Sequence, residues 1–258
     1  MAPVLFHIQK NIGIITLNRP EKLNAFNREM ALLLQAKLDE CHSLHEVRCV
    51  YITGAGKGFC AGQDLSEVTD PGGPGMVNMV ADHYNPIVVR IRNLPKPVVA
   101  AVNGVAAGAG ANIALCCDVV VAAESASFVQ AFSKIGLIPD SGGTYTLPRL
   151  VGWQKASALM MLGEKIGAAE ALGLGMLYKV FNNEEFASAS ISLAEGLAQM
   201  PTRGLALTKH ALNYSFANSW ESQLLLENDL QQKAAATQDF KEGVQAFLEK
   251  RQPKFKGE

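Results

Sequence analysis

The feature that most constrains the fold is a unit of an apolar strand, a glycine-rich turn and a helical segment, which occurs twice. Residues 47–53 are rich in β-branched and aromatic side chains and run into the glycine-rich segment 54–64. Residues 98–102 are wholly apolar and run into a second glycine- and alanine-rich turn at 103–110. Repeated units of this kind favour an α/β fold with connections that cross between strands.

The remaining segments divide the chain into two regions. A β-hairpin is expected at 5–9 and 12–17, followed by a helix that Asn27 caps. Segment 70–75 contains proline and three glycines, which predicts a mobile stretch, and a helix is expected at 76–92. After residue 152 the pattern is mainly helical. We therefore expect a core at 1–195 that carries the site and a helical region at 196–258.

Composition excludes several classes of protein. The chain has 258 residues and a formal net charge of −1, which gives no electrostatic reason to expect nucleic acid or an anionic membrane as a partner. Its five cysteines form no C-x-x-C pair, so neither a zinc site nor a disulfide framework is indicated. The N-terminus lacks a signal-peptide pattern and no apolar run is long enough to span a membrane. We expect a soluble cytoplasmic protein without a bound metal.

A single carboxylate stands in an uncharged turn. Asp140 follows Ile138-Pro139 and precedes Ser141-Gly142-Gly143, which opens an apolar segment. An aspartate at the start of a helix usually caps it by accepting backbone N–H groups. The second interpretation is that Asp140 is a catalytic acid or base. Phe132 and Tyr145 would raise its pKa by excluding water and a helix N-terminus would lower it, so the direction is open.

The two glycine-rich turns have more than one interpretation. Segment 54–59 lacks the Ser or Thr that a phosphate-binding P-loop requires, because Gly58 occupies that position. The glycine spacing at 104–110 does not match a dinucleotide-binding fingerprint. Both turns follow a buried strand, so they either supply two N–H donors of an oxyanion hole or are ordinary tight turns. Cys60 is the best candidate for a reactive thiol, although no base lies beside it in the sequence.

Four segments together resemble the crotonase (enoyl-CoA hydratase/isomerase) superfamily over essentially the whole chain. They are LNRPEKLNA at 17–25, GFCAGQDL at 58–65, KPVVAAVNG at 96–104 with AGAG at 107–110, and GLIPDSGGT at 136–144. The resemblance implies a spiral core of ββα turns and a C-terminal helical region that forms trimers, often paired into hexamers. It also implies that the substrate is a coenzyme A thioester and that no further cofactor is needed.

The resemblance assigns roles to individual residues. The N–H groups of Ala61 and Ala109 would hold the thioester carbonyl oxygen. Lys254 and Phe255 resemble tail residues that approach the nucleotide end of the ligand in a neighbouring subunit. The residues that would line the coenzyme A side are Leu23, Ala25, Ala61, Gly62, Gln63, Asp64 and Leu65.

The departures from the family pattern narrow the expected reaction. The two glutamates that a hydratase uses to add water correspond to Asn112 and Phe132, and neither is acidic. Asp140 remains as the single acid/base, which suits isomerisation, and its segment most resembles the isomerases of phenylacetate degradation. These convert ring-1,2-epoxyphenylacetyl-CoA to oxepin-CoA and can shift a double bond in an unsaturated acyl-CoA.

Three other functions stay open. An aryl-CoA dehalogenase or hydrolase would use Asp140 as a nucleophile. The histidine that assists such a nucleophile would fall near Asn85, and its absence there speaks against this alternative. An enoyl-CoA hydratase would need another way to activate water. A non-catalytic acyl-CoA-binding protein would use Asp140 only as a helix cap.

Overall fold

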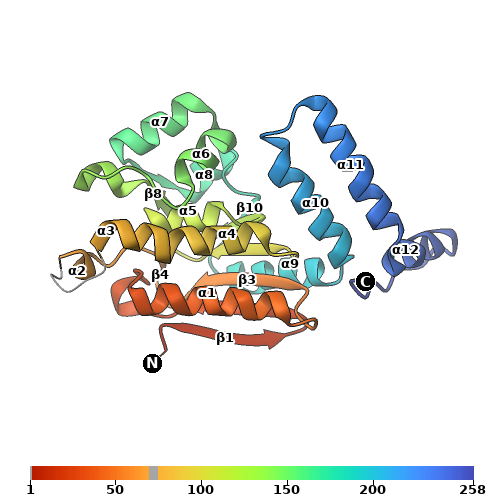
Figure 1. Cartoon of the computed structure of the whole chain (residues 1–258). Helices are drawn as coiled ribbons and strands as arrows, with labels where there is room; N and C mark the ends of the chain where they lie inside the picture. The colour runs from red at the N-terminus through yellow and green to blue at the C-terminus, as the bar shows by residue number, and fades with distance from the viewer. Residues whose placement is uncertain (1, 70–74) are drawn as a thin grey trace.

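The computed structural model describes residues 2–69 and 75–258 and contains two β-sheets surrounded by helices (Figure 1). One sheet has the strand order β1-β2-β3-β5-β7-β10 and the other β4-β6-β8-β9. The strands are β1 (Val4–Gln9), β2 (Ile12–Leu17), β3 (Cys49–Gly54), β4 (Gly58–Cys60), β5 (Val98–Val102), β6 (Val105–Ala107), β7 (Val119–Ala123), β8 (Ser127–Val129), β9 (Lys165–Gly167) and β10 (Lys179–Phe181).

Helices connect the strands and form most of the second half of the chain. The α-helices are α1 (Arg28–Ser43), α2 (Leu65–Val68), α3 (Gly75–Asn78), α4 (Asn85–Asn93), α5 (Ala109–Leu115), α6 (Gly143–Val151), α7 (Trp153–Leu162), α8 (Ala168–Gly173), α9 (Phe186–Ala198), α10 (Thr202–Ser215), α11 (Trp220–Ala235) and α12 (Gln238–Leu248). Two 3-10 helices, η1 (Pro20–Lys22) and η3 (Ala131–Ile135), and a π-helix, η2 (Met79–Tyr84), complete them.

The core repeats a ββα unit in which the two strands lie in different sheets. In each of the pairs β3 and β4, β5 and β6, and β7 and β8, the first strand joins the six-stranded sheet and the second the four-stranded sheet. Neighbouring repeats pair in parallel in both sheets. Parallel strands require crossover connections, so the chain advances as a spiral. The α/β prediction is confirmed.

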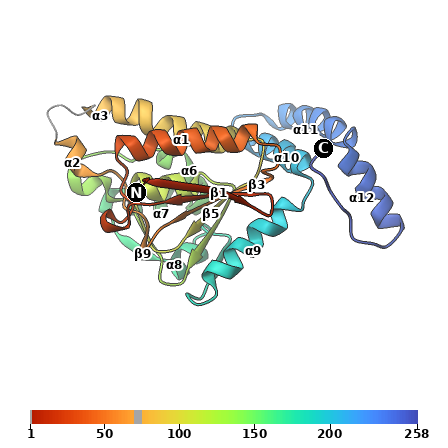
Figure 2. The same cartoon turned by 90° about the horizontal axis from the view of Figure 1, so that it is seen from below.

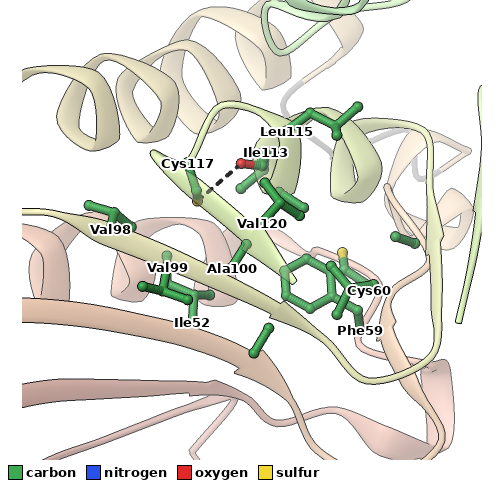
Figure 3. Packing of buried hydrophobic residues seen from close by; sticks show 14 of the residues in the cluster. Ile52, Phe59, Cys60, Val98, Val99, Ala100, Ile113, Leu115, Cys117 and Val120 are labelled. Atoms are coloured by element: carbon green, nitrogen blue, oxygen red, sulfur yellow. Dashed lines mark hydrogen bonds between the residues drawn. The ribbon is translucent and has the colours of Figure 1, made fainter. Parts of the chain in front are cut away.

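The central strands are buried because helices cover both faces of the six-stranded sheet. All five residues of β5 are buried, and α1 and α4 lie on one side of this sheet with α9 on the other (Figure 2). Figure 3 shows Ile52 of β3, Ala100 of β5 and Phe59 of β4 within one packed cluster. A continuous apolar sequence suits a strand that is covered on both faces.

Most predicted elements are present with shifted ends. Asn27 caps α1 as expected, since its Oδ1 accepts the N–H of Met30 at 2.9 Å. The helix expected at 76–92 is helical throughout but contains the π-helix η2. Residues 70–74 of the segment predicted to be mobile lie outside the described part of the chain. The strands β4, β6 and β9 were not predicted.

Helices α10 to α12 extend away from the two sheets (Figures 1 and 2). Lys209 of α10 connects them to the core, because its Nζ lies 2.7 Å from Asp118 Oδ2 and 2.6 Å from the carbonyl oxygen of Ile91. The tail folds back onto α12, where the Asp239 carboxylate accepts the N–H groups of Lys256 and Gly257 at 2.7 Å each. Within residues 2–69 and 75–258, no helix combines the length and apolar character needed to cross a membrane.

Candidate active site

A cavity of about 200 Å³ lies where the two glycine-rich turns meet the Asp140 segment. Its wall combines residues from four parts of the chain: the turn after β4, the end of η2, the turn before α5, and η3 with the segment that follows it. Asp140 is the one carboxylate among the described residues that line it. The fold thus brings together three segments that sequence analysis singled out.

The two glycine-rich turns pack directly against each other. Gly62 has a φ of +92°, and a Cβ at this position would lie 3.0 Å from the carbonyl oxygen of Ala107 and 3.7 Å from the nitrogen of Ala109. A Cβ at Gly110 would lie 2.5 Å from the carbonyl oxygen of Cys60. Glycine is therefore required at both positions for the backbones to approach so closely.

Backbone N–H groups without an acceptor among the described residues occur on both turns. Ala109 is the first residue of α5, and the first N–H groups of a helix have no partner within it. On the other turn, the N–H of Ala61 donates to the carbonyl oxygen of Leu23 at 2.9 Å. The N–H of Gly62 donates to the Cys60 sulfur. The free donor is the N–H of Gln63. The prediction that Ala61 supplies this donor is wrong, because its N–H is already engaged.

The carboxylate of Asp140 does not cap the following helix. Helix α6 begins after Gly142 without a side-chain cap, and it is the carbonyl oxygen of Asp140 that accepts the N–H of Gly143 at 2.9 Å. The Asp140 carboxylate accepts a hydrogen bond from Ser141 Oγ at 2.9 Å. Burial raises the pKa of Asp140, and the hydrogen bond from Ser141 opposes this effect only in part.

Aromatic residues contribute unequally to the environment of Asp140. Phe132 is buried and lines the cavity, as expected. Tyr145 is 49% exposed, does not line the cavity and packs edge-on against Phe216. The expectation that Tyr145 shields Asp140 is therefore wrong, because its side chain points to the surface side of α6.

Asn112 and Phe132 are the residues that the sequence resemblance matches to the two glutamates of a hydratase. Asn112 is fully buried in α5, donates from Nδ2 to the carbonyl oxygen of Asp140 at 2.9 Å, and accepts from Gln130 Nε2 at 2.7 Å. Phe132 lies close to the turn before α5, since a Cβ at Gly108 would be 3.6 Å from its ring. Neither side chain can act as an acid or base.

Comparison with known proteins identifies the family. The sequence pattern of the enoyl-CoA hydratase/isomerase family matches residues 7–258. The chain belongs to the enoyl-CoA hydratase/isomerase family. It is 49% identical to the 1,2-epoxyphenylacetyl-CoA isomerase of Escherichia coli, with 100% of this chain and 99% of that protein covered. It is 43% identical to a probable enoyl-CoA hydratase of Rhodobacter capsulatus, with 98% of each chain covered.

Solved structures of family members have the same fold. The enoyl-CoA hydratase of Bacillus anthracis superposes with a TM-score of 0.92 at 33% identity, covering 99% of this chain and 100% of that one. The predicted ββα spiral core with a C-terminal helical region, characteristic of this crotonase fold, is confirmed. The chain is an enzyme of the enoyl-CoA hydratase/isomerase family.

The residues predicted to line the coenzyme A side fall into two groups. Ala61, Gly62, Gln63 and Leu65 line the cavity. The other three, Leu23, Ala25 and Asp64, are not among the residues that line it. Contact of these three with the coenzyme A part of a ligand stays a prediction.

Asp64 is held by several polar contacts. Its carboxylate forms an ion pair with Arg19 at 2.8 Å and accepts hydrogen bonds from the backbone N–H and Oγ of Ser66 at the start of α2. Arg19 also donates to the carbonyl oxygen of Ala25 at 2.6 Å. Asp64 therefore holds the loop that contains Leu23 and Ala25 against the turn after β4.

The tail residues lie apart from the cavity of their own chain. The N–H of Lys254 donates to Glu242 at 2.7 Å, and the carbonyl oxygen of Phe255 accepts from Arg48 at 2.9 Å. Both belong to the surface formed by α12 and the tail. Contact of Lys254 and Phe255 with a ligand in a neighbouring subunit stays a prediction.

Two other residues considered in the sequence, Cys60 and Asn85, do not line the cavity. Burial raises the pKa of the Cys60 thiol to about 12, so it stays protonated and unreactive. Asn85, near which a dehalogenase would have its histidine, is an exposed residue at the start of α4. In the part of the chain that the structure describes, His, Cys, Asp and Glu side chains form no cluster able to hold a metal ion.

Tyr84 belongs to the site and was not predicted from the sequence. Tyr84 is only 1% exposed, lines the cavity, and donates from its hydroxyl to Gln63 Oε1. Nothing in the pattern of the predicted helix marked this tyrosine, because its direction depends on the π-helix η2. A helical wheel with ordinary α-helical spacing gives a wrong direction after a π-helix.

Proposed function

We propose that this enzyme isomerises acyl-CoA thioesters with Asp140 as the acid/base, converting ring-1,2-epoxyphenylacetyl-CoA to oxepin-CoA. The same site would shift a double bond in an unsaturated acyl-CoA. The similarity to the 1,2-epoxyphenylacetyl-CoA isomerase of Escherichia coli, at 49% identity over the full length, supports the choice of substrate. On this proposal the enzyme serves in phenylacetate degradation.

One observation carries the proposal: Asp140 is the one carboxylate among the described residues that line the cavity. Asn112 and Phe132 fill the positions of the two hydratase glutamates with groups that cannot activate water. A reaction that moves a proton from one carbon to another needs one acid/base and no bound water. Isomerisation is the reaction that this set of side chains supports.

The mechanism begins with the proton next to the thioester carbonyl. Asp140 takes this proton, and the negative charge moves to the thioester oxygen as an enolate. The N–H groups of Gln63 and Ala109 stabilise that oxygen, and each donor in such a site contributes about 3 kcal/mol. Asp140 then returns the proton to a different carbon. With the ring epoxide as substrate, the carbon–carbon bond shared by the epoxide and the six-membered ring also breaks, which leaves the seven-membered oxepin ring, and no atom is gained or lost.

The cavity favours this use of a carboxylate. Phe132, Leu137 and Leu65 provide apolar surface around Asp140. Their burial of the carboxyl group raises its pKa, which makes Asp140 a stronger base than a solvated aspartate. A raised pKa of Asp140 also lies closer to the pKa of the carbon that it deprotonates, which favours the proton transfer.

The proposal includes a homotrimer, or a hexamer built of two trimers. Large apolar side chains stand exposed on the C-terminal helices, including Trp220 at 74%, Leu225 at 72% and Phe247 at 83%. Apolar groups gathered on one helical region are typical of a surface that a partner covers. In this assembly, Lys254 and Phe255 would approach the nucleotide end of a ligand bound to the neighbouring subunit.

A panel of substrates tests the reaction. The panel contains ring-1,2-epoxyphenylacetyl-CoA, a β,γ-enoyl-CoA and a 2-enoyl-CoA, and products are followed by mass and ultraviolet absorbance. We expect a product of unchanged mass and altered absorbance from the first two thioesters. A product heavier by one water from the 2-enoyl-CoA as the main activity would instead assign the enzyme as a hydratase.

Two further outcomes would replace the proposal. Halide release from a halobenzoyl-CoA, with a covalent adduct on Asp140, would show a dehalogenase. Binding of acyl-CoA without turnover of any thioester in the panel would show a non-catalytic binding protein.

A further inference from the structure

Gln63 lines the cavity, its backbone N–H has no acceptor among the described residues, and its side chain is held at both ends. Its Oε1 accepts from the Tyr84 hydroxyl, and its Nε2 lies 3.2 Å from Glu67 Oε2. Glu67 is itself fixed, because its two carboxylate oxygens accept the backbone N–H of Arg28 at 2.8 and 3.0 Å. Gln63 therefore connects the end of η2 to α2 and, through Glu67, to the start of α1.

Tyr84 has little freedom of its own. It is buried, and its ring packs edge-on against Phe26 with 5.9 Å between the centroids. Phe26 pairs with the same turn, since its N–H donates to the Gly62 carbonyl oxygen at 2.7 Å and its carbonyl accepts the N–H of Asp64 at 2.8 Å. The ring and the hydroxyl of Tyr84 thus both act on the turn that carries Gln63.

The hydroxyl does more than packing requires. Phenylalanine would fill the same space, whereas a buried tyrosine hydroxyl needs a hydrogen-bond partner. We propose that Tyr84 is a positioning residue, whose hydrogen bond to the Gln63 side chain aims the Gln63 N–H at the enolate oxygen. This inference rests on the proposed isomerase function and adds the residue that orients one of its two donors.

The protonation of Tyr84 agrees with this role. Burial raises the pKa of Tyr84, and the negative charges of Asp140 and Glu67 add to the effect. The hydroxyl therefore keeps its proton and remains a donor to Gln63. Because its proton is committed to Gln63 Oε1, Tyr84 is not a second base for the reaction.

Two single variants test the role from opposite sides of the hydrogen bond. Y84F removes the hydroxyl and keeps the ring, and Q63M removes the side-chain amide and keeps the backbone N–H. We expect kcat to fall about 10-fold in each, which is part of the roughly 10²–10³-fold that complete loss of such a donor costs. The dissociation constant for unreactive phenylacetyl-CoA should stay unchanged, because the donor acts mainly on the enolate.

The double variant Y84F/Q63M distinguishes one shared interaction from two independent effects. We expect its kcat to be about equal to that of the less active single variant, because the effects of two residues that share one interaction are not additive. Y51F is the matched control: it removes another buried tyrosine hydroxyl, which lies 2.8 Å from Ser190 Oγ in the core. Y51F should lower the melting temperature and keep the wild-type kcat.

The results separate this role from the function itself. Wild-type kcat in Y84F, additive losses in the double variant, or a loss of phenylacetyl-CoA affinity as large as the fall in kcat would each overturn the positioning role. If Y84F does not fold, Q63M alone decides by the same criteria. An inactive wild-type protein, or an active D140N variant, would overturn the proposed function, and neither result depends on Tyr84.

Discussion

Asn112 and Asp140 are joined by a hydrogen bond of 2.9 Å between the Asn112 side chain and the Asp140 carbonyl oxygen. Asn112 is oriented in turn by Gln130, whose Nε2 lies 2.7 Å from Asn112 Oδ1. Gly143 leaves room for this amide, because a Cβ there would lie 2.2 Å from Asn112 Nδ2. Asn112, which the sequence resemblance matches to a hydratase glutamate, thus fixes the backbone of the proposed base.

Replacing Asn112 should impair both activity and stability. N112A removes one of the two donors to the Asp140 carbonyl and leaves the Gln130 Nε2 without its acceptor, and an unpaired buried polar group costs about 1–3 kcal/mol of unfolding free energy. Freed from Asn112, the turn should shift, and a misplacement of about 1 Å can lower kcat by roughly 10²-fold. Denaturant unfolding and steady-state kinetics measure the two effects.

Asn213 provides the control for that variant. It makes a comparable amide-to-carbonyl bond, from Nδ2 to the carbonyl oxygen of Arg92 at 2.8 Å, outside the cavity. N213A should lose stability and retain kcat. Equal losses of kcat in N112A and N213A would mean that Asn112 supports the fold without orienting Asp140.

The predictability of the fold depended on the length of each element. The strand at 98–102 was predicted because five consecutive apolar residues suit a strand that is buried on both faces. The strands β4 and β6 have three residues each and lie within glycine-rich segments that were interpreted as turns. Segments this short show no periodicity, and only pairing with strands distant in the sequence makes them strands.

The site was predictable where chemistry is local and not where it depends on tertiary contacts. Asp140 was identified because it is the one charged residue in an uncharged turn. The interpretation of Asp140 as a helix cap was wrong, because α6 starts after Gly142 and no side chain caps it. Ala61 was the wrong donor because Leu23, from the loop before α1, accepts its N–H. Tyr84 was missed because a π-helix sets its direction.

A partly buried ion pair should hold the C-terminal helices to the core. Lys209 of α10 is almost fully buried and lies 2.7 Å from Asp118, which also accepts the N–H of Val98 at 2.8 Å. K209M leaves Asp118 without its nearest cation, and a hydrogen bond to a charged group contributes about 1.5–3 kcal/mol to the unfolding free energy. The exposed pair of Lys233 and Asp229 is the control, and K233M should cost less than about 1 kcal/mol. Similar unfolding free energies for K209M and K233M would contradict this account.

The raised pKa of Asp140 predicts that D140N is more stable than the wild type at neutral pH. Burial disfavours the charged form in the folded state, so folding is most favourable with Asp140 protonated. That stability is fully present below the ordinary aspartate value of 3.8 and is lost as the pH rises through the raised pKa of the folded state. Asparagine carries no such charge, so the difference in melting temperature should shrink toward acidic pH. A D140N variant that is less stable than the wild type at neutral pH would contradict the assignment.

The central claim is that Asp140 moves the proton, and the turnover of ring-1,2-epoxyphenylacetyl-CoA by D140N tests it most directly. Loss of a general acid/base should lower kcat by about 10²–10⁴-fold. Affinity for phenylacetyl-CoA should remain, because asparagine has nearly the same shape and the two N–H donors are untouched. Formation of oxepin-CoA by D140N at the wild-type rate, with normal affinity, would contradict the account.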